Sequence, residues 1–131
     1  MSIGTKPAGA KTVLYVEDNE ANRKIVRQLL KNTSYTLIEA YDGEAGVAAA
    51  LERRPDLILM DIQLPKISGL EAIARIRADA ATASTPIIAI TSFALSGDDQ
   101  KAMEAGATAY LAKPYSPRDL IALVRKLLPE T

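Results

Sequence analysis

Five polar residues that could take part in chemistry stand at the ends of short apolar runs in this sequence. Along the chain they are Glu17, Asp18, Asp61, Thr91 and Lys113. A carboxylate can act as a nucleophile, neighbouring carboxylates can hold a divalent cation, and a lysine with a hydroxyl can contact phosphoryl oxygens. Phosphoryl transfer needs these parts, because that reaction depends mostly on positioning and on neutralising charge.

Three of these residues are acids, and this raises the possibility of a bound metal ion. Like charges brought together favour either protonation of one carboxyl group or a bound cation. The chain contains no His and no Cys. A metal ion would therefore have oxygen ligands, which suits Mg²⁺. The same two absences remove the commonest general base, disulfides and thiolate zinc sites.

Each of these residues also has an ordinary structural interpretation. An Asp at a strand end is often a turn or capping residue, and Thr91 suits a strand without any function. A lysine before a proline is usually solvated. The shared position of the polar groups, at the ends of four apolar runs, is what favours a functional site.

The elements that would position these residues alternate along the chain. Several apolar runs are apolar throughout, as is typical of strands buried on both faces of a parallel sheet, and amphipathic segments between them predict helices. The predicted strands are residues 13–16, 36–38, 57–60, 87–90 and 109–112, and the predicted helices are 20–31, 43–51, a segment around 70–76, 96–106 and 116–128. This repeat predicts an α/β fold with a doubly wound, five-stranded parallel sheet flanked by five helices.

The size and composition predict one globular domain. The chain has 131 residues, of which 48% are hydrophobic. Residues 1–10 are rich in Gly, Pro, Ala and Thr, which predicts a flexible tail, and residues 11–131 form the predicted domain. Sixteen basic residues balance sixteen acidic ones, which argues against nucleic acid as a partner. The sequence has neither a signal peptide nor an apolar stretch of about 20 residues, so we expect no membrane insertion and a cytoplasmic location.

The motifs around the polar residues resemble those of a known protein family. They are Val16-Glu17-Asp18-Asn19, Leu59-Met60-Asp61-Ile62-Gln63-Leu64-Pro65, Ser68-Gly69-Leu70-Glu71, Thr91-Ser92 and Ala112-Lys113-Pro114. In combination, over about residues 11–128, they resemble the receiver domain of bacterial two-component response regulators. The stretch from Met60 to Glu71 is most similar to single-domain members of that family. The resemblance implies a flavodoxin-like fold with strand order 2-1-3-4-5, in which the first and third strands are neighbours.

The resemblance also implies a role for the acidic residues. Asp61 would accept a phosphoryl group from a phosphohistidine, carried by a histidine kinase or a histidine phosphotransfer protein. Asp18 and Asp61 would bind Mg²⁺ together with the main-chain carbonyl of Gln63. Glu17 would lie beside the metal.

The remaining residues would read out the phosphorylated state. Thr91 and Lys113 would contact the phosphoryl group, and Tyr110 would turn inward when Thr91 moves. The bond between Lys113 and Pro114 is expected to be cis. The resemblance thus implies a switch and not an enzyme with a separate substrate. With no output domain in the sequence, it would signal by contacts with a downstream protein target, through the first helix and the surface of the fourth helix, fifth strand and fifth helix.

Two departures from the family pattern concern the lifetime of the phosphoryl group. The residue after Thr91 is Ser92, where relatives often have Ala. Phe93 is bulky and apolar, where many relatives are polar. Both residues would flank the phosphoryl site.

Other interpretations fit parts of the sequence. Phosphatases of the haloacid-dehalogenase type also use an Asp nucleophile at a strand end, but the position of their second Asp is occupied here by Gln63. A pseudo-receiver that only docks partners would not need the acidic pair together with Asp61, Thr91 and Lys113. A nucleotide-binding domain is disfavoured, because neither a Gly-x-x-x-x-Gly-Lys nor a Gly-x-Gly-x-x-Gly motif is present.

Overall fold

Strands and helices alternate along the chain, as the sequence predicts. The structure, a computed structural model, describes residues 11–91 and 97–130, so the predicted tail and Ser92 to Ser96 lie outside the described residues. In chain order the elements are β1 (Thr12–Val16), α1 (Glu20–Lys31), β2 (Thr36–Ala40), α2 (Gly43–Arg53), β3 (Leu57–Asp61), α3 (Gly69–Ala78), a 3₁₀ turn (Ala80–Thr82), β4 (Ile87–Thr91), α4 (Asp98–Ala105), β5 (Ala109–Ala112) and α5 (Pro117–Leu127).

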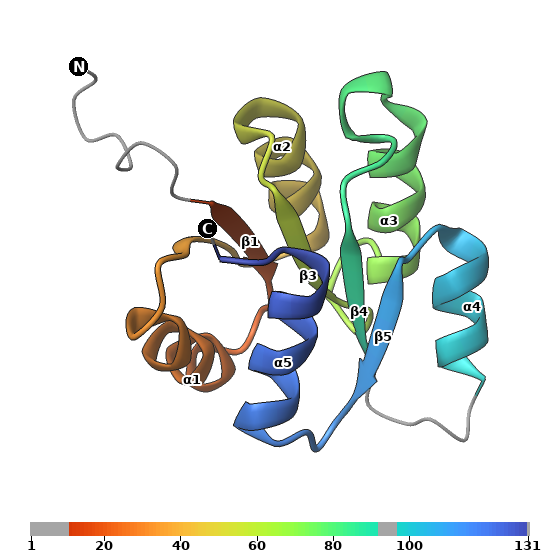
Figure 1. Cartoon of the computed structure of the whole chain (residues 1–131). Coiled ribbons are helices and arrows are strands. Elements are labelled where there is room, and N and C mark those ends of the chain that lie inside the picture. Colours follow the sequence, from red (N-terminus) through yellow and green to blue (C-terminus); the bar gives the residue numbers. More distant parts are fainter. Residues whose placement is uncertain (1–10, 92–96, 131) are drawn as a thin grey trace.

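The five strands form one parallel sheet in the order β2-β1-β3-β4-β5. Helices α1 and α5 cover one face, and α2, α3 and α4 cover the other (Figure 1). The doubly wound fold and its strand order are therefore confirmed. The order reverses between β1 and β3, so the carboxyl ends of these two strands border the crevice where such folds place their sites.

The buried strands explain the apolar runs in the sequence. All residues of β1, β3 and β4 are buried, because both faces of the sheet carry helices. Successive side chains of β1 point to opposite faces. Val13 and Tyr15 therefore join the core under α1 and α5, whereas Leu14 and Val16 join the core under α2 and α3.

Side chains at the helix ends fix where most of the helices begin. Asn19 and Ser116 cap α1 and α5 by accepting hydrogen bonds from main-chain N–H groups, and Asp42 and Ser68 do the same for α2 and α3. Helix α4 differs from the prediction, since it begins at Asp98 after Gly97, whose φ is +80°.

Across residues 11–91 and 97–130, none of the helices has the length and apolar character needed to cross a bilayer.

Gly69, the first residue of α3, lies unusually close to the end of β3. A Cβ atom at this position would lie 2.2 Å from the main-chain oxygen of Asp61 and 2.4 Å from the Cα of Ile62. The N–H of Gly69 also donates to the carbonyl of Ile62 at 3.0 Å. The loop after β3 can fold back this tightly only because position 69 has no side chain.

We predict that Gly69→Ala destabilises the fold by about 3 kcal/mol, because main-chain atoms cannot move aside as a flexible side chain can. Urea unfolding measures this loss. The control is Gly97→Ala, where φ is +80° but no described atom lies within 4 Å of the added Cβ. That variant bears only left-handed backbone strain of about 1 kcal/mol. Equal losses in the two variants would contradict the close approach at Gly69.

Candidate functional site

Three of the predicted site residues meet at the carboxyl end of the sheet. The ammonium nitrogen of Lys113 lies 2.8 Å from Asp61 Oδ2 and 3.3 Å from Glu17 Oε1. The register of the sheet brings the two acids together, because Val16 pairs with Met60 and the acids follow directly. Asp61 is 2% exposed and Glu17 is 1% exposed. The structure therefore brings together Glu17, Asp61 and Lys113, whereas no hydrogen bond or ion pair within residues 11–91 and 97–130 joins Asp18 to them.

Both carboxylate oxygens of Asp61 accept hydrogen bonds. Oδ1 accepts from the main-chain N–H of Gln63 at 2.8 Å, and Oδ2 accepts from Lys113. The bond from Gln63 is a local turn that follows from the spacing of the two residues. It holds the side chain of Asp61 in one orientation at the strand end.

Glu17 is held even more firmly, by three donors on its two carboxylate oxygens. Oε1 accepts from the Tyr15 hydroxyl at 3.2 Å as well as from Lys113, and Oε2 accepts from the N–H of Asn19 at 3.1 Å. The sequence analysis did not identify Tyr15 as part of this site. The available signal was a hydroxyl-bearing residue inside an otherwise aliphatic run, two positions before an acid on the same face of the strand.

Arg23 is a second residue that the sequence analysis missed. Its buried guanidinium donates to the main-chain oxygen of Glu17 at 2.7 Å and to Glu20 at 2.6 Å. It also lies over the ring of Tyr41, 4.1 Å from the ring centre, in a cation–π contact. Arg23 thus ties α1 to the end of β1 and to the residue that follows β2.

Lys113 stays charged in this pocket. Burial lowers the pKa of the Lys113 ammonium, but the hydrogen bond and the negative charge of Asp61, followed by those of Glu17, outweigh it and leave the pKa raised. One ammonium faces two buried carboxylates, so these three side chains together carry one net negative charge. This surplus favours a further cation.

The acidic residues offer a limited set of metal ligands. Asp18 is exposed, and within the described part of the chain no group of three or more Asp, Glu, His or Cys side chains could hold a metal ion. Mg²⁺ does not need such a group, since it usually binds one or two carboxylates and completes its shell with carbonyls, phosphate and water. The charge of the pocket and its oxygen-only donors therefore fit Mg²⁺, provided that main-chain oxygens contribute.

Thr91 and Tyr110 lie on the neighbouring strands β4 and β5. Thr91 ends β4 and is fully buried, and its hydroxyl has no hydrogen-bond partner among the residues that the structure describes. Buried hydroxyls are normally paired, so this one is available to a group that enters the pocket. Tyr110 is 44% exposed, so it is turned outward. Ser92 and Phe93, the two departures from the family pattern, lie outside the described residues.

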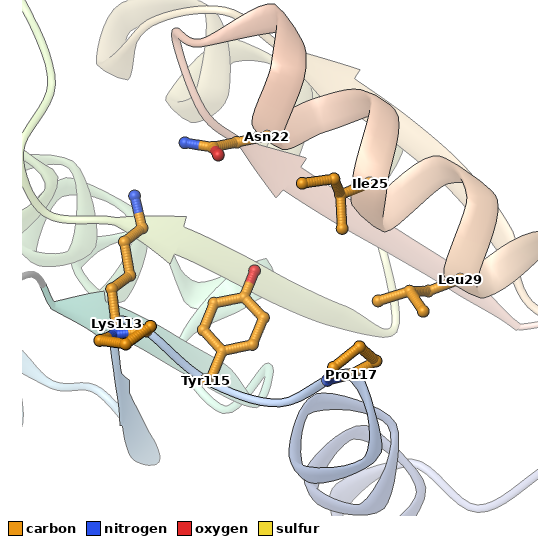
Figure 2. Close-up of a pocket in the computed structure, with 7 residues that line it drawn as sticks. Asn22, Ile25, Leu29, Lys113, Tyr115 and Pro117 are labelled. Atoms are coloured by element: carbon orange, nitrogen blue, oxygen red, sulfur yellow. The ribbon is translucent and has the colours of Figure 1, made fainter.

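A groove of about 460 Å³ opens next to the pocket, between α1 and the loop from β5 to α5. Figure 2 shows the side chains of Asn22, Ile25 and Leu29 on one side and those of Lys113, Tyr115 and Pro117 on the other. The peptide bond between Lys113 and Pro114, in the wall of the groove, is cis, as predicted. Ile25 is 53% exposed. Lys113 lines this groove and its ammonium also contacts Asp61.

Comparisons with known proteins agree with this geometry. Residues 13–125 match the response regulator receiver domain family. The polar-differentiation response regulator DivK of Brucella anthropi is 42% identical over 118 residues, which cover 90% of this chain and 96% of the relative. The predicted likeness to single-domain regulators is thereby confirmed.

Solved structures give the same result. The receiver domain of a sensor histidine kinase from Pseudomonas aeruginosa, crystallised with a magnesium ion in its active-site cleft, is 36% identical, with a TM-score of 0.85 and coverage of 90% of this chain and 97% of that one. The chemotaxis response regulator CheY4 of Vibrio cholerae is 29% identical, with a TM-score of 0.85 and coverage of 91% and 99%. The chain therefore belongs to the receiver domains of response regulators, which act in two-component signalling.

Proposed function

We propose that Asp61 is the phosphoacceptor of this receiver domain and that a histidine kinase or a histidine phosphotransfer protein supplies the phosphoryl group. The observation that carries the proposal is the state of the Asp61 carboxylate. It is buried, oriented by the N–H of Gln63 and paired with the Lys113 ammonium. The domain then acts in the cytoplasm as a switch, and not as an enzyme that turns over a separate substrate.

The transfer itself exchanges one bond for another. A carboxylate oxygen of Asp61 bonds to phosphorus while the bond from phosphorus to the histidine nitrogen of the partner breaks. The ammonium of Lys113, already 2.8 Å from Asp61, moves with the added charge and pairs with a phosphoryl oxygen. No His or Cys is needed as a general base, because a carboxylate is already a nucleophile.

Asp18, Asp61 and the main-chain carbonyl of Gln63 are the proposed Mg²⁺ ligands, with Glu17 beside the ion. When bound, Mg²⁺ supplies charge neutralisation for the phosphoryl oxygens. The protein's own contribution is orientation. Glu17 is locked by three donors, and Gln63 is fixed to Asp61 by its N–H. Such fixed groups lower the cost of assembling the site.

Thr91 and Tyr110 are the proposed readout of phosphorylation. The buried hydroxyl of Thr91, which has no partner among residues 11–91 and 97–130, gains an acceptor when a phosphoryl oxygen arrives. Movement of Thr91 toward Asp61 frees space that the outward Tyr110 can fill. Because the two packings differ in these contacts, phosphorylation shifts the balance between them. The surface around α4, β5 and α5 then presents a different shape to a downstream protein target.

The groove between α1 and the loop from β5 to α5 is the proposed contact surface for the phosphodonor protein. Its apolar lining and the exposed Ile25 suit a protein partner rather than a charged small molecule. A partner seated there would bring its phosphohistidine near the carboxylate of Asp61, since Lys113 joins the groove to the pocket.

We predict that incubation with a small phosphoryl donor and Mg²⁺ adds the mass of one phosphoryl group, and that EDTA prevents it. Asp61→Asn keeps the shape of the side chain but removes the anionic nucleophile, so this variant should stay unmodified in mass spectrometry. Equal labelling of Asp61→Asn and the parent protein would show that another residue is the acceptor. Steady turnover of small phosphate esters would instead indicate a phosphatase.

Removal of one proposed metal ligand should abolish the response to Mg²⁺. At a hundredfold excess over its Kd, a ligand that binds only the folded state stabilises that state by about 2.7 kcal/mol. We predict that Asp18→Asn loses most of this gain, measured as the Mg²⁺-dependent rise in Tm.

The control is Asp79→Asn, an exposed Asp that caps the 3₁₀ turn, a role that Asn can also fill. It should keep the full response to Mg²⁺. A normal response in Asp18→Asn would remove Asp18 from the ligand set.

Thr91→Ala should separate phosphorylation from its readout. The variant lacks the hydroxyl but keeps Asp61 and Lys113, so it should still accept a phosphoryl group. We predict that the NMR shifts around Tyr110 then stay close to those of the unphosphorylated protein. Thr91→Ser is the matched control, because it retains the hydroxyl and should restore the response. NMR shifts around Tyr110 in phosphorylated Thr91→Ala that match those of the phosphorylated parent protein would argue against this coupling.

A further inference from the structure

Tyr15 carries a hydroxyl into a core where an aliphatic side chain would suffice. Its side chain is fully buried among the apolar residues under α1 and α5. Residues two apart on a strand share a face and lie about 7 Å apart, so the long ring of Tyr15 reaches along β1 toward Glu17. Its hydroxyl lies 3.2 Å from Glu17 Oε1. A buried hydroxyl is costly unless it is paired, and here its partner is a site carboxylate.

A second hydroxyl lies behind the first. The Tyr115 hydroxyl lies near the Tyr15 hydroxyl, close enough for each group to influence the other. The phenol of Tyr15 has one hydrogen to donate, and that hydrogen goes to Glu17. Figure 2 shows Tyr115 in the wall of the groove, its hydroxyl pointing away from the loop that carries it. Tyr115 therefore links the lining of the groove to Tyr15, which in turn donates to Glu17.

Both phenols remain protonated donors. Burial, followed by the influence of Tyr115 and Glu17, raises the pKa of the Tyr15 hydroxyl, and burial also raises the pKa of the Tyr115 hydroxyl. The Tyr15 hydroxyl supplies one of the two hydrogen bonds that reach Oε1 of Glu17, and Lys113 supplies the other.

We propose that Tyr15 is a positioning residue that holds Glu17 for Mg²⁺ binding, and that Tyr115 supports it by acting through Tyr15. The inference rests on the function proposed above for Asp61 and its metal. Without the Tyr15 hydroxyl, Oε1 of Glu17 keeps Lys113 as its remaining donor. The ammonium is then drawn toward Glu17, and both carboxylates lose the orientation that the pocket gives them. Loss of the Tyr15 hydroxyl therefore weakens Mg²⁺ binding, whereas the Asp61 carboxylate remains present as the nucleophile.

The first test compares two tyrosines that each lose a buried hydroxyl. Tyr15→Phe keeps the ring, so the core stays filled, and we expect about tenfold weaker Mg²⁺ binding in a calorimetric or NMR titration of the unphosphorylated protein. The matched control is Tyr35→Phe. The Tyr35 hydroxyl is also buried, but it donates to the carbonyl of Leu128, just after α5. Tyr35→Phe should lower Tm and leave the affinity for Mg²⁺ unchanged.

The second test is a double-mutant cycle. Tyr115→Phe alone should weaken Mg²⁺ binding less than Tyr15→Phe does. In the Tyr15→Phe background it should add nothing, because the group through which it acts is gone. Additive losses would overturn the proposed route from Tyr115 through Tyr15. An affinity for Mg²⁺ within about twofold of the parent in Tyr15→Phe would overturn the positioning role itself.

The parent protein distinguishes this inference from the proposed function. If the parent binds Mg²⁺ and is phosphorylated on Asp61 while Tyr15→Phe binds Mg²⁺ equally well, only the positioning role fails. If the parent neither binds Mg²⁺ nor labels at Asp61, the proposed function fails and the positioning role fails with it.

Discussion

The structure depends on one arrangement of charge, in which a single ammonium serves two buried carboxylates. Removing Glu17 and Asp61 from water is costly, and Lys113 offsets only part of that cost. Replacing all three by apolar residues would favour stability, so the cluster is best explained by what it can bind. The remaining negative charge makes the pocket receptive to a cation, and the cation in turn makes it receptive to a phosphoryl group.

Much of the surrounding chain is organised to keep this cluster in register. The parallel pairing of β1 with β3 sets the two acids side by side, and Gly69 lets α3 start directly against the end of β3. Arg23 fixes the main-chain oxygen of Glu17 from α1. None of these contacts touches a reacting atom. They set the distances between the ammonium and the two carboxylates, and the charge balance of the pocket depends on these distances.

The sequence predicted the charged residues of the site better than it predicted the residues that hold them in place. Glu17, Asp61 and Lys113 were found because each follows an apolar run, and parallel strands bring their carboxyl ends to one edge. Tyr15 was missed because the hydrophobic pattern of a sequence indicates burial and not hydrogen bonding. A tyrosine inside an apolar run is therefore predicted to be a core residue. Arg23 was missed because its partners are main-chain and aromatic groups that only the folded chain brings together. The start of α4 was placed too early, because Gly97 adopts a left-handed conformation that local pattern does not reveal.

Strand β5 and the loop that follows it contribute to both proposed contact surfaces. Tyr110 lies within β5 and is exposed, whereas Lys113 and Tyr115 follow β5 and line the groove beside α1. A change of charge at Asp61 reaches both, since Lys113 contacts the carboxylate directly and Thr91 pairs with Ala112 across β4 and β5. In the proposed function, the short segment from Tyr110 to Tyr115 couples the groove beside α1 to the surface around α4, β5 and α5. Coupling between equilibria is reciprocal, so in the proposed function phosphorylation of Asp61 and the binding of a partner at either surface change each other's equilibrium by the same factor.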